Sequence, residues 1–301
     1  MMRPLLTVFA VTLCTVLCFA GVSHADDDDD ESDSKTLDLS ARPNQLPSGY
    51  AEYGVVVAFP AGPEFDPPVD RWKYDGIGGW ITLTAFARVG ITDKIEVDGW
   101  TTMAAGHPEN SPGARTNRYG GGHLDASYKL SPTASVTVGA SFIDPWLAMY
   151  GHTTFQHYFM GSKLKPAGHL GGRFGTRLAD KVRVEVTPRL TFVADAVDVF
   201  GTQKNWLLGE LFVRAHTRVY DDFFAGLRVG VRTGDKLSLA ANDGATLPVI
   251  TELRYVADQV DLGFDVGFGS MLTSKDLPSH VAYTNPGTSF YLAAVLNWRL
   301  E

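Results

Sequence analysis

Hydrophobic residues alternate with polar or small ones along most of the chain between residues 50 and 300. A repeat of two residues is that of a β-strand whose two faces meet different surroundings. In KVRVEVT, for example, the charged residues at 181, 183 and 185 share one face and the valines at 182, 184 and 186 share the other. No stretch of comparable length has a helical period, so the pattern predicts an all-β chain.

Five short turn sequences separate pairs of alternating segments. They lie within GITDKIEVDGW, KLSPTASVTVG, TRLADKVRVEV, RVYDDFFAGLRVG and YVADQVDLGF. With a strand on each side of every turn and one at each end of the series, the sequence predicts twelve strands. The predicted strands cover residues 50–59, 78–89, 94–104, 119–130, 134–143, 168–178, 181–194, 205–219, 223–233, 247–256, 259–268 and 288–300. Pro188 cannot donate a hydrogen bond to a sheet, so we expect a bulge there.

The short turns alternate with longer connections, such as DPWLAMYGHTTFQHYFMGSKLKPA. Short turns on one side and long loops on the other are typical of a transmembrane antiparallel up-and-down β-barrel, and an even number of strands puts both ends of the barrel on the turn side. The alternative is a soluble β-sandwich, which has the same alternation.

Aromatic residues at the strand ends favour the barrel, because amphipathic rings prefer the level of the lipid headgroups. One expected girdle lies toward the long loops and the other toward the turns. The first contains Trp72, Tyr74, Trp80, Trp100, Tyr119, Trp146, Tyr150 and Trp206, and the second Tyr128, Tyr220, Phe223, Tyr255 and Trp298. A closed barrel would also leave no sheet edge unpaired in hydrocarbon.

The N-terminal residues have the features of a secretory signal. Arg3 precedes an apolar run from Leu5 to Ala20, and small residues at Ser23 and Ala25 suit cleavage after Ala25. Both cysteines, Cys14 and Cys18, fall inside this segment. We therefore predict a signal peptide at 1–25 and a mature chain without cysteine; an uncleaved anchor is the alternative.

An acidic stretch follows the predicted signal. Residues 26–31 and 33 carry seven of the 34 acidic residues, and charges so dense repel each other and bury nothing. We expect a disordered leader at 26–48, ahead of a barrel at 49–301. The rest of the chain is nearly balanced in charge, which gives no reason to expect a nucleic-acid partner.

The turn Gly90 to Glu96, of the form G-[IL]-T-D-[KR]-[IL]-E, resembles turns of bacterial outer-membrane β-barrel proteins of the porin-like and putative transporter type. The resemblance covers roughly residues 50–300 and implies an outer-membrane location, contact with membrane lipid and handling by the barrel-assembly machinery. These proteins commonly end on an aromatic residue, whereas here Trp298 is followed by Arg299, Leu300 and Glu301.

If the apolar face contacts lipid, the opposite face lines the interior. The residues predicted to line a pore are Arg88, Glu96, Asp98, Asp125, Arg173, Arg177, Arg183, Glu185, Glu210, Arg214, Arg228, Arg232, Glu252, Arg254, Asp261 and Asp265. Arginines concentrate on the sixth to ninth predicted strands and acids are enriched on the third, fourth and eleventh, which predicts a lumen with a basic and an acidic wall. Such a lumen favours small polar or anionic solutes.

Two other functions remain open at this stage. Opposed charges could fill the lumen of a closed barrel whose loops bind a partner, and a third possibility is an outer-membrane hydrolase. The chain has histidines on predicted loops and strands, but none lies in a nucleophile or metal motif. We therefore predict a non-enzyme, name no catalytic or metal-binding residue and no cofactor, and leave the oligomeric state open.

Overall fold

The computed structural model describes residues 42–66, 71–77, 80–106, 117–143, 165–178, 182–197, 203–233, 235–240, 245, 247–257, 259–268 and 290–300. These residues form strands and one short 3-10 helix, and no described helix is long and apolar enough to cross a membrane. The strands are β1 (Ala51–Asp66), β2 (Arg71–Ile77), β3 (Trp80–Thr92), β4 (Ile95–Gly106), β5 (Asn117–Ser131), β6 (Ala134–Ile143), β7 (Lys165–Leu178), β8 (Val182–Val197), β9 (Gln203–Tyr220), β10 (Phe223–Arg232), β11 (Val249–Val256), β12 (Val260–Phe268) and β13 (Phe290–Leu300); the helix is η1 (Asp235–Leu237).

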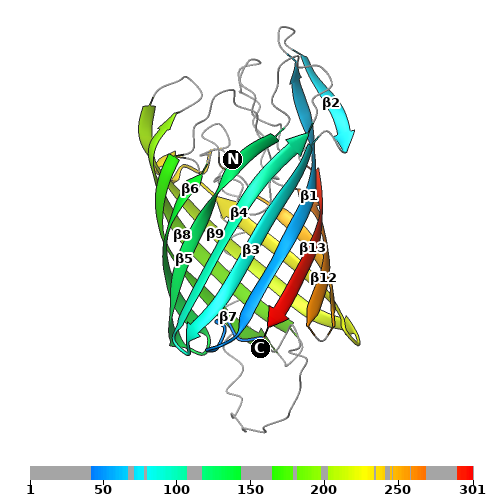
Figure 1. The fold of residues 1–301 in the computed structure, drawn as a ribbon. Coiled ribbons are helices and arrows are strands. Elements are labelled where there is room, and N and C mark those ends of the chain that lie inside the picture. The colour runs from blue at the N-terminus through cyan, green and yellow to red at the C-terminus, as the bar shows by residue number, and fades with distance from the viewer. Residues whose placement is uncertain are drawn as a thin grey trace.

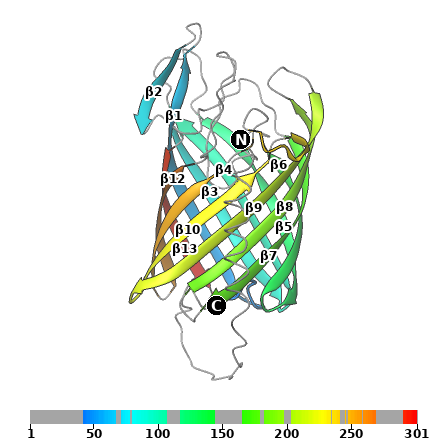
Figure 2. The same cartoon turned by 180° about the vertical axis from the view of Figure 1, so that it is seen from behind.

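The sheet closes on itself (Figures 1 and 2). Each strand pairs antiparallel with its neighbour, and β13 pairs with β1 from Ala51↔Leu300 to Ala61↔Phe290. Among the described residues, β2 pairs only with the far part of β1 and projects beyond the wall. The remaining twelve strands form a closed antiparallel barrel, which confirms the predicted fold class and rules out the sandwich.

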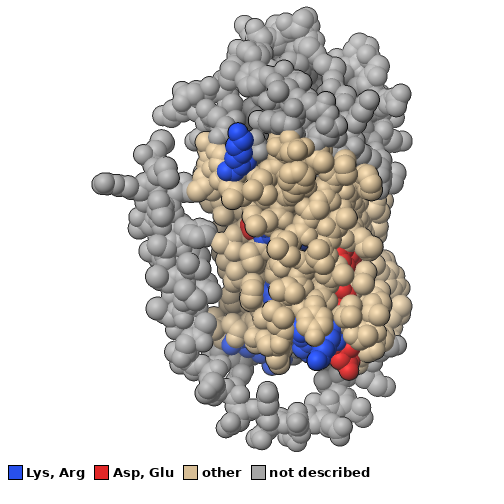
Figure 3. All heavy atoms as spheres, turned by 90° about the vertical axis from the view of Figure 1, so that its left-hand side faces the viewer, with Lys and Arg blue, Asp and Glu red and all other residues tan. Residues whose placement is uncertain are grey.

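The register gives the wall two chemically different faces. Arg228 pairs with Arg214 on the inside, while the next pair, Val229 with Val213, faces outward. Large apolar side chains stay exposed on the outer face, including Leu227 and Leu262. Figure 3 shows one side of this surface: charged side chains gather at its lower edge, at the short turns, and the band above them is mainly uncharged. The two faces suit a wall with lipid outside and polar groups inside.

The twelve predicted segments each correspond to a strand of the barrel, and two predictions about strand detail were wrong. The register of β8 continues through Pro188↔Leu211 without a shift, and the irregularity lies between Val193 and Ala196 instead. The strand β2 was predicted to be part of a long loop; it forms because β1 extends past the barrel and offers an edge from Pro63 to Asp66.

The aromatic prediction holds for the turn side but not for two residues of the other girdle, Trp100 and Trp206; the side chains of its other six residues lie outside the described part of the structure. Tyr128, Tyr220 and Phe223 are exposed near the turns, and Trp298 stacks on Tyr53 with ring centroids 5.5 Å apart. Trp100 and Trp206 instead point inward. Trp100 packs on His123, with ring centroids 4.7 Å apart, and Trp206 is buried.

Candidate functional site

The inner face of the barrel gathers charged side chains from most strands of the wall. Strand register and ion pairs place all sixteen predicted residues, from Arg88 to Asp265, on this face. The predicted arginine-rich strands correspond to β7, β8, β9 and β10, and the acid-enriched strands to β4, β5 and β12. The two walls are linked by ion pairs, because Arg173 of β7 lies 3.1 Å from Glu96 of β4.

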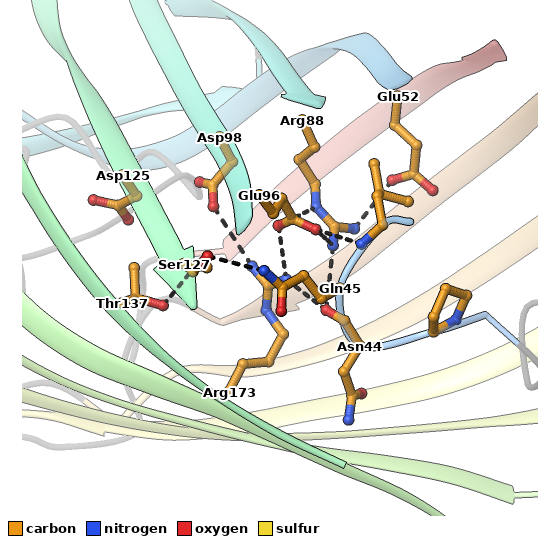
Figure 4. Close-up of polar contacts among 12 residues, drawn as sticks. Asn44, Gln45, Glu52, Arg88, Glu96, Asp98, Asp125, Ser127, Thr137 and Arg173 are labelled. Carbon is orange, nitrogen blue, oxygen red and sulfur yellow. Dashed lines mark hydrogen bonds and ion pairs between the residues drawn. The ribbon is translucent and has the colours of Figure 1, made fainter. Parts of the chain in front are cut away.

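Glu96 lies at the centre of the polar cluster at the turn end of the lumen (Figure 4). Its Oε2 accepts a hydrogen bond from Arg88 Nη2 at 2.9 Å, and its Oε1 accepts from Arg173 Nη1 at 3.1 Å. Arg88 also reaches Glu52 Oε2 at 3.1 Å. The Glu96 side chain is fully buried, so these two arginines compensate a carboxylate that is shielded from solvent.

A segment ahead of β1, residues 42–48, lies inside the barrel at this end. The guanidinium of Arg42 makes two contacts of 2.6 Å to the carboxylate of Asp261 on β12. The side chain of Asn44 donates to the carbonyl of Gly175 on β7 at 3.1 Å, and Arg183 Nη2 donates to its Oδ1 at 2.9 Å. Because β12 and β7 are five positions apart in the order of a twelve-strand barrel, the segment crosses the lumen.

The same segment is fixed to the wall on the side of β4 and β5. Gln45 Nε2 donates to the carbonyl of Ser127 at 2.9 Å, and the backbone N–H of Leu46 donates to Glu96 Oε2 at 2.7 Å. Asn44, Gln45 and Leu46 are buried. The leader predicted to be disordered up to residue 48 is therefore ordered from 42 onward, because buried partners satisfy its polar groups; residues 1–41 lie outside the described part of the chain.

A second cluster surrounds Glu252 on the arginine-rich side. Its Oε2 accepts from Arg214 Nε at 2.7 Å and hydrogen-bonds with His216 Nε2 at 2.6 Å, while Oε1 lies 3.2 Å from Arg228 Nε. Arg228 also lies 3.5 Å from Asp265. The arginines predicted to form a basic wall are thus neutralised locally, and the contrast between the two walls is weaker than predicted.

The members of these ion pairs differ in how much of each side chain is accessible. Arg214 is 36% exposed and its partner Glu252 0%. Arg88 is 25% exposed against 0% for Glu96, and Arg189 is 23% exposed against 1% for Asp125. In each of these three pairs the arginine side chain is more exposed than the carboxylate that it contacts. The accessible charge in these pairs is therefore mainly positive.

The strand histidines also face inward, each beside a carboxylate. His169 and Asp125 are hydrogen-bonded, His216 contacts Glu252, and His123 Nε2 lies 3.7 Å from Asp98 Oδ1. The loop histidines at 107, 152, 157 and 280 lie outside the described residues. Neither the inward histidines nor segment 42–48 was predicted as part of a site; strand alternation could have oriented the histidines, but no sequence signal indicated the path of the segment.

The sequence matches no protein-family model and no curated protein. Solved structures do match the barrel. A structure described as the NanC porin aligns with a TM-score of 0.52 at 9% identity, covering 82% of this chain and all of that one. A COG4313 outer-membrane channel from Pseudomonas putida F1 aligns with a TM-score of 0.50 at 11% identity, covering 92% of this chain and all of that one. The chain has the fold of outer-membrane channels. At these identities the likeness concerns the fold alone.

Proposed function

We propose that this barrel is a passive outer-membrane pore for small polar or anionic solutes. The observation that carries the proposal is the unequal exposure within the ion pairs of Arg214, Arg88 and Arg189, where Arg214, for example, is 36% exposed and Glu252 0%. The order is reversed in two other pairs, Arg183 with Glu185 and Arg232 with Glu210. Accessible guanidinium groups in a narrow passage with low-dielectric walls raise the local concentration of anions. The polar inner face and the apolar outer face are those that a water-filled membrane barrel requires.

Segment 42–48 would form the narrowest part of this pore. It crosses the turn end, and its contacts with Asp261, Gly175, Ser127 and Glu96 come from strands on different sides of the lumen. Solutes would pass beside it or after it moves. In the orientation expected for such barrels the short turns face the periplasm, so the constriction would lie on the periplasmic side.

Recording from the purified protein in a planar lipid bilayer tests the proposal. We expect discrete conductance steps, and in a salt gradient we expect a reversal potential of the sign that anion preference gives. Conducting steps with cation preference would contradict the role of the exposed arginines. A folded protein that inserts and never conducts would contradict the pore itself.

The second candidate function is a closed barrel whose loops bind a partner. The observation in its favour is the same segment, because 42–48 crosses the turn end of the lumen and is held there by buried polar contacts such as that of Leu46 with Glu96. A protein without conductance, even after residues 26–48 are deleted, would favour this function. The outer-membrane hydrolase remains third, and we assign no catalytic residue to it.

A further inference from the structure

Two histidines from different strands face one carboxylate inside the barrel. His123 and Asp125 project from β5 and His169 projects from β7, and all three are buried. One potential ligand atom from each lies within 4.8 Å of the other two. His169 Nε2 is hydrogen-bonded to Asp125 Oδ1, and His123 Nε2 lies 3.7 Å from Asp125 Oδ2. Imidazole nitrogens and a carboxylate oxygen therefore converge on one point of the wall.

The intervening strand has a glycine at the point where these groups meet. Gly139 of β6 pairs with Asp125 on one side and with His169 on the other. A Cβ at Gly139 would collide with Asp125 Oδ1 and His169 Nε2. The missing side chain is what allows residues two strands apart to touch.

A second carboxylate, on the neighbouring strand, contacts one of the two histidines. Asp98 of β4 directs Oδ1 toward His123 Nε2 at 3.7 Å, and its Oδ2 lies 3.7 Å from Arg173. Asp125 is held in a similar way, because its Oδ2 lies 2.8 Å from Arg189. A carboxylate that faces the ligand group with one oxygen and is anchored through the other is a common arrangement of metal ligands.

We propose that His123, Asp125 and His169 bind a divalent transition-metal ion of the zinc type, and that Asp98, which contacts His123 but lies outside the group formed by these three, moves in as a fourth ligand. Two imidazole nitrogens and two carboxylate oxygens suit this class and not calcium or magnesium, which prefer oxygen alone. Tetrahedral ligands at zinc distances lie about 3.3 to 3.6 Å apart. The ligand atoms of His123, Asp125 and His169 already lie within 4.8 Å of one another, so His123 would move closer, while the hydrogen-bonded His169 Nε2 and Asp125 Oδ1 would move apart.

Binding changes one hydrogen bond. Without the metal ion, His169 Nε2 and Asp125 Oδ1 are joined by a hydrogen bond. With the ion bound, that nitrogen and that oxygen would each donate a lone pair to the metal. The imidazole proton would then lie on Nδ1, or leave if the ring was charged. The guanidinium groups of Arg173 and Arg189 oppose a cation, so we expect weaker binding than at a closed structural zinc site.

The chain offers a matched control on the arginine-rich side. His216 reaches Glu252 across β10, where a Cβ at Gly226 would collide with the imidazole. This pair has the same geometry, a carboxylate and nearby arginines, but among the described residues no second histidine joins it. Substituting His216 therefore removes a histidine from the lumen without removing a proposed metal ligand, which is what a control requires.

The test is a calorimetric titration of the full mature protein with zinc chloride, after treatment with chelator and without a histidine tag. The proposal does not depend on conduction, so a non-conducting barrel can be titrated equally well. We expect one saturable ion per chain, and at least a tenfold loss of affinity in His123→Gln and in His169→Gln. Glutamine keeps a hydrogen-bonding group at each position, and His216→Gln should bind as wild type does.

Cobalt provides a second readout, because a tetrahedral nitrogen and oxygen site gives a visible absorption band in the wild type that His123→Gln and His169→Gln should lose. No binding by the folded wild type would overturn the proposal. Equal binding by the double variant His123→Gln/His169→Gln would also overturn it, since the ion would then lie elsewhere. Loss of binding in His216→Gln would show that the effect is not specific to this group.

Discussion

Arg42 and Asp261 are joined by two contacts of 2.6 Å, one from each terminal guanidinium nitrogen to a different carboxylate oxygen. The two residues are 219 positions apart in the chain, and their side chains are largely buried. This pair fixes one end of segment 42–48 to the wall at β12. It is the most direct point at which to test whether the segment obstructs the lumen.

Replacing Arg42 by Gln should loosen the segment without disturbing the wall. Asp261 keeps Arg299 at 3.3 Å and Asn297 Nδ2 at 3.1 Å, so its carboxylate stays partnered. A hydrogen bond to a charged group contributes about 1.5 to 3 kcal/mol, and about 1.4 kcal/mol corresponds to a tenfold change in the equilibrium between seated and displaced segment. We expect larger or more frequent conductance steps in bilayer recordings of Arg42→Gln.

Ser48→Ala is the control for that experiment, because Ser48 is exposed and its hydroxyl makes only a 3.5 Å contact with the carbonyl of Ile91. It should conduct as wild type does. Deletion of residues 26–48 should have a larger effect than Arg42→Gln. Identical conductance in wild type, Arg42→Gln and the deletion variant would show that the segment does not obstruct passage.

Removing an accessible arginine should change ion selectivity, and removing a buried one should not. Arg214→Gln removes a guanidinium that is 36% exposed, while Glu252 keeps Arg228 and His216 as partners. Arg232→Gln removes the same charge from a side chain only 6% exposed. In a salt gradient we expect the reversal potential of Arg214→Gln to shift toward cation preference, and that of Arg232→Gln to stay near the wild type. Equal shifts would mean that net charge, and not accessibility, sets the preference.

A charge on the outer face should impair assembly. Val229 faces outward beside Val213, and an arginine at the lipid-facing midplane of a barrel costs about 2 to 4 kcal/mol. We expect Val229→Arg to lower the yield of folded, heat-modifiable protein on gel electrophoresis far more than Val229→Ala or Arg228→Ala. Equal tolerance of Val229→Arg and Arg228→Ala would mean that the inner and outer faces are exchanged.

Two glycines on adjacent strands should respond differently to a methyl group. In Gly139→Ala the new Cβ would collide with Asp125 and His169, and overpacking of this kind costs about 1 to 3 kcal/mol. Gly168 faces outward, and a Cβ there would meet only the carbonyl of Gly139 at 4.0 Å. Urea unfolding in detergent should show a lower midpoint for Gly139→Ala and little change for Gly168→Ala. A stable Gly139→Ala variant would show that the wall can shift to accept the side chain.

The alternation of residues was sufficient to predict the strands and their two faces, because each face of a membrane strand has one kind of neighbour along its whole length; the lengths of the turns and loops and the aromatic residues were needed to predict a barrel. It placed Arg228 inside and Val229 outside, and the structure agrees. The prediction failed for Trp100 and Trp206, because these residues were assigned by their position near strand ends and not by the face on which they lie. For these two residues, alternation was the better guide.

The contacts inside the lumen could not be predicted in the same way. Asp125 of β5 and His169 of β7 can touch because Gly139, on the strand between them, has no side chain. The contact therefore depends on three strands at once. The path of residues 42–48 depends on partners as distant in the sequence as Asp261. An acidic stretch precedes these residues, so a prediction from neighbouring positions alone favours disorder there. Local sequence patterns describe neighbours along a strand, whereas these contacts join residues between 44 and 219 positions apart.

The separation between Arg42 and Asp261 also bears on the order in which the molecule assembles. Contacts between residues so distant in the chain form slowly, because a long loop must close before they contribute to stability. Residues 42–48 immediately precede β1, which closes the wall against β13 only when the last strand is in place. We therefore expect the segment to reach its final position late, together with closure. A barrel trapped before that step would have an intact sheet over most of its circumference and an open seam at β1.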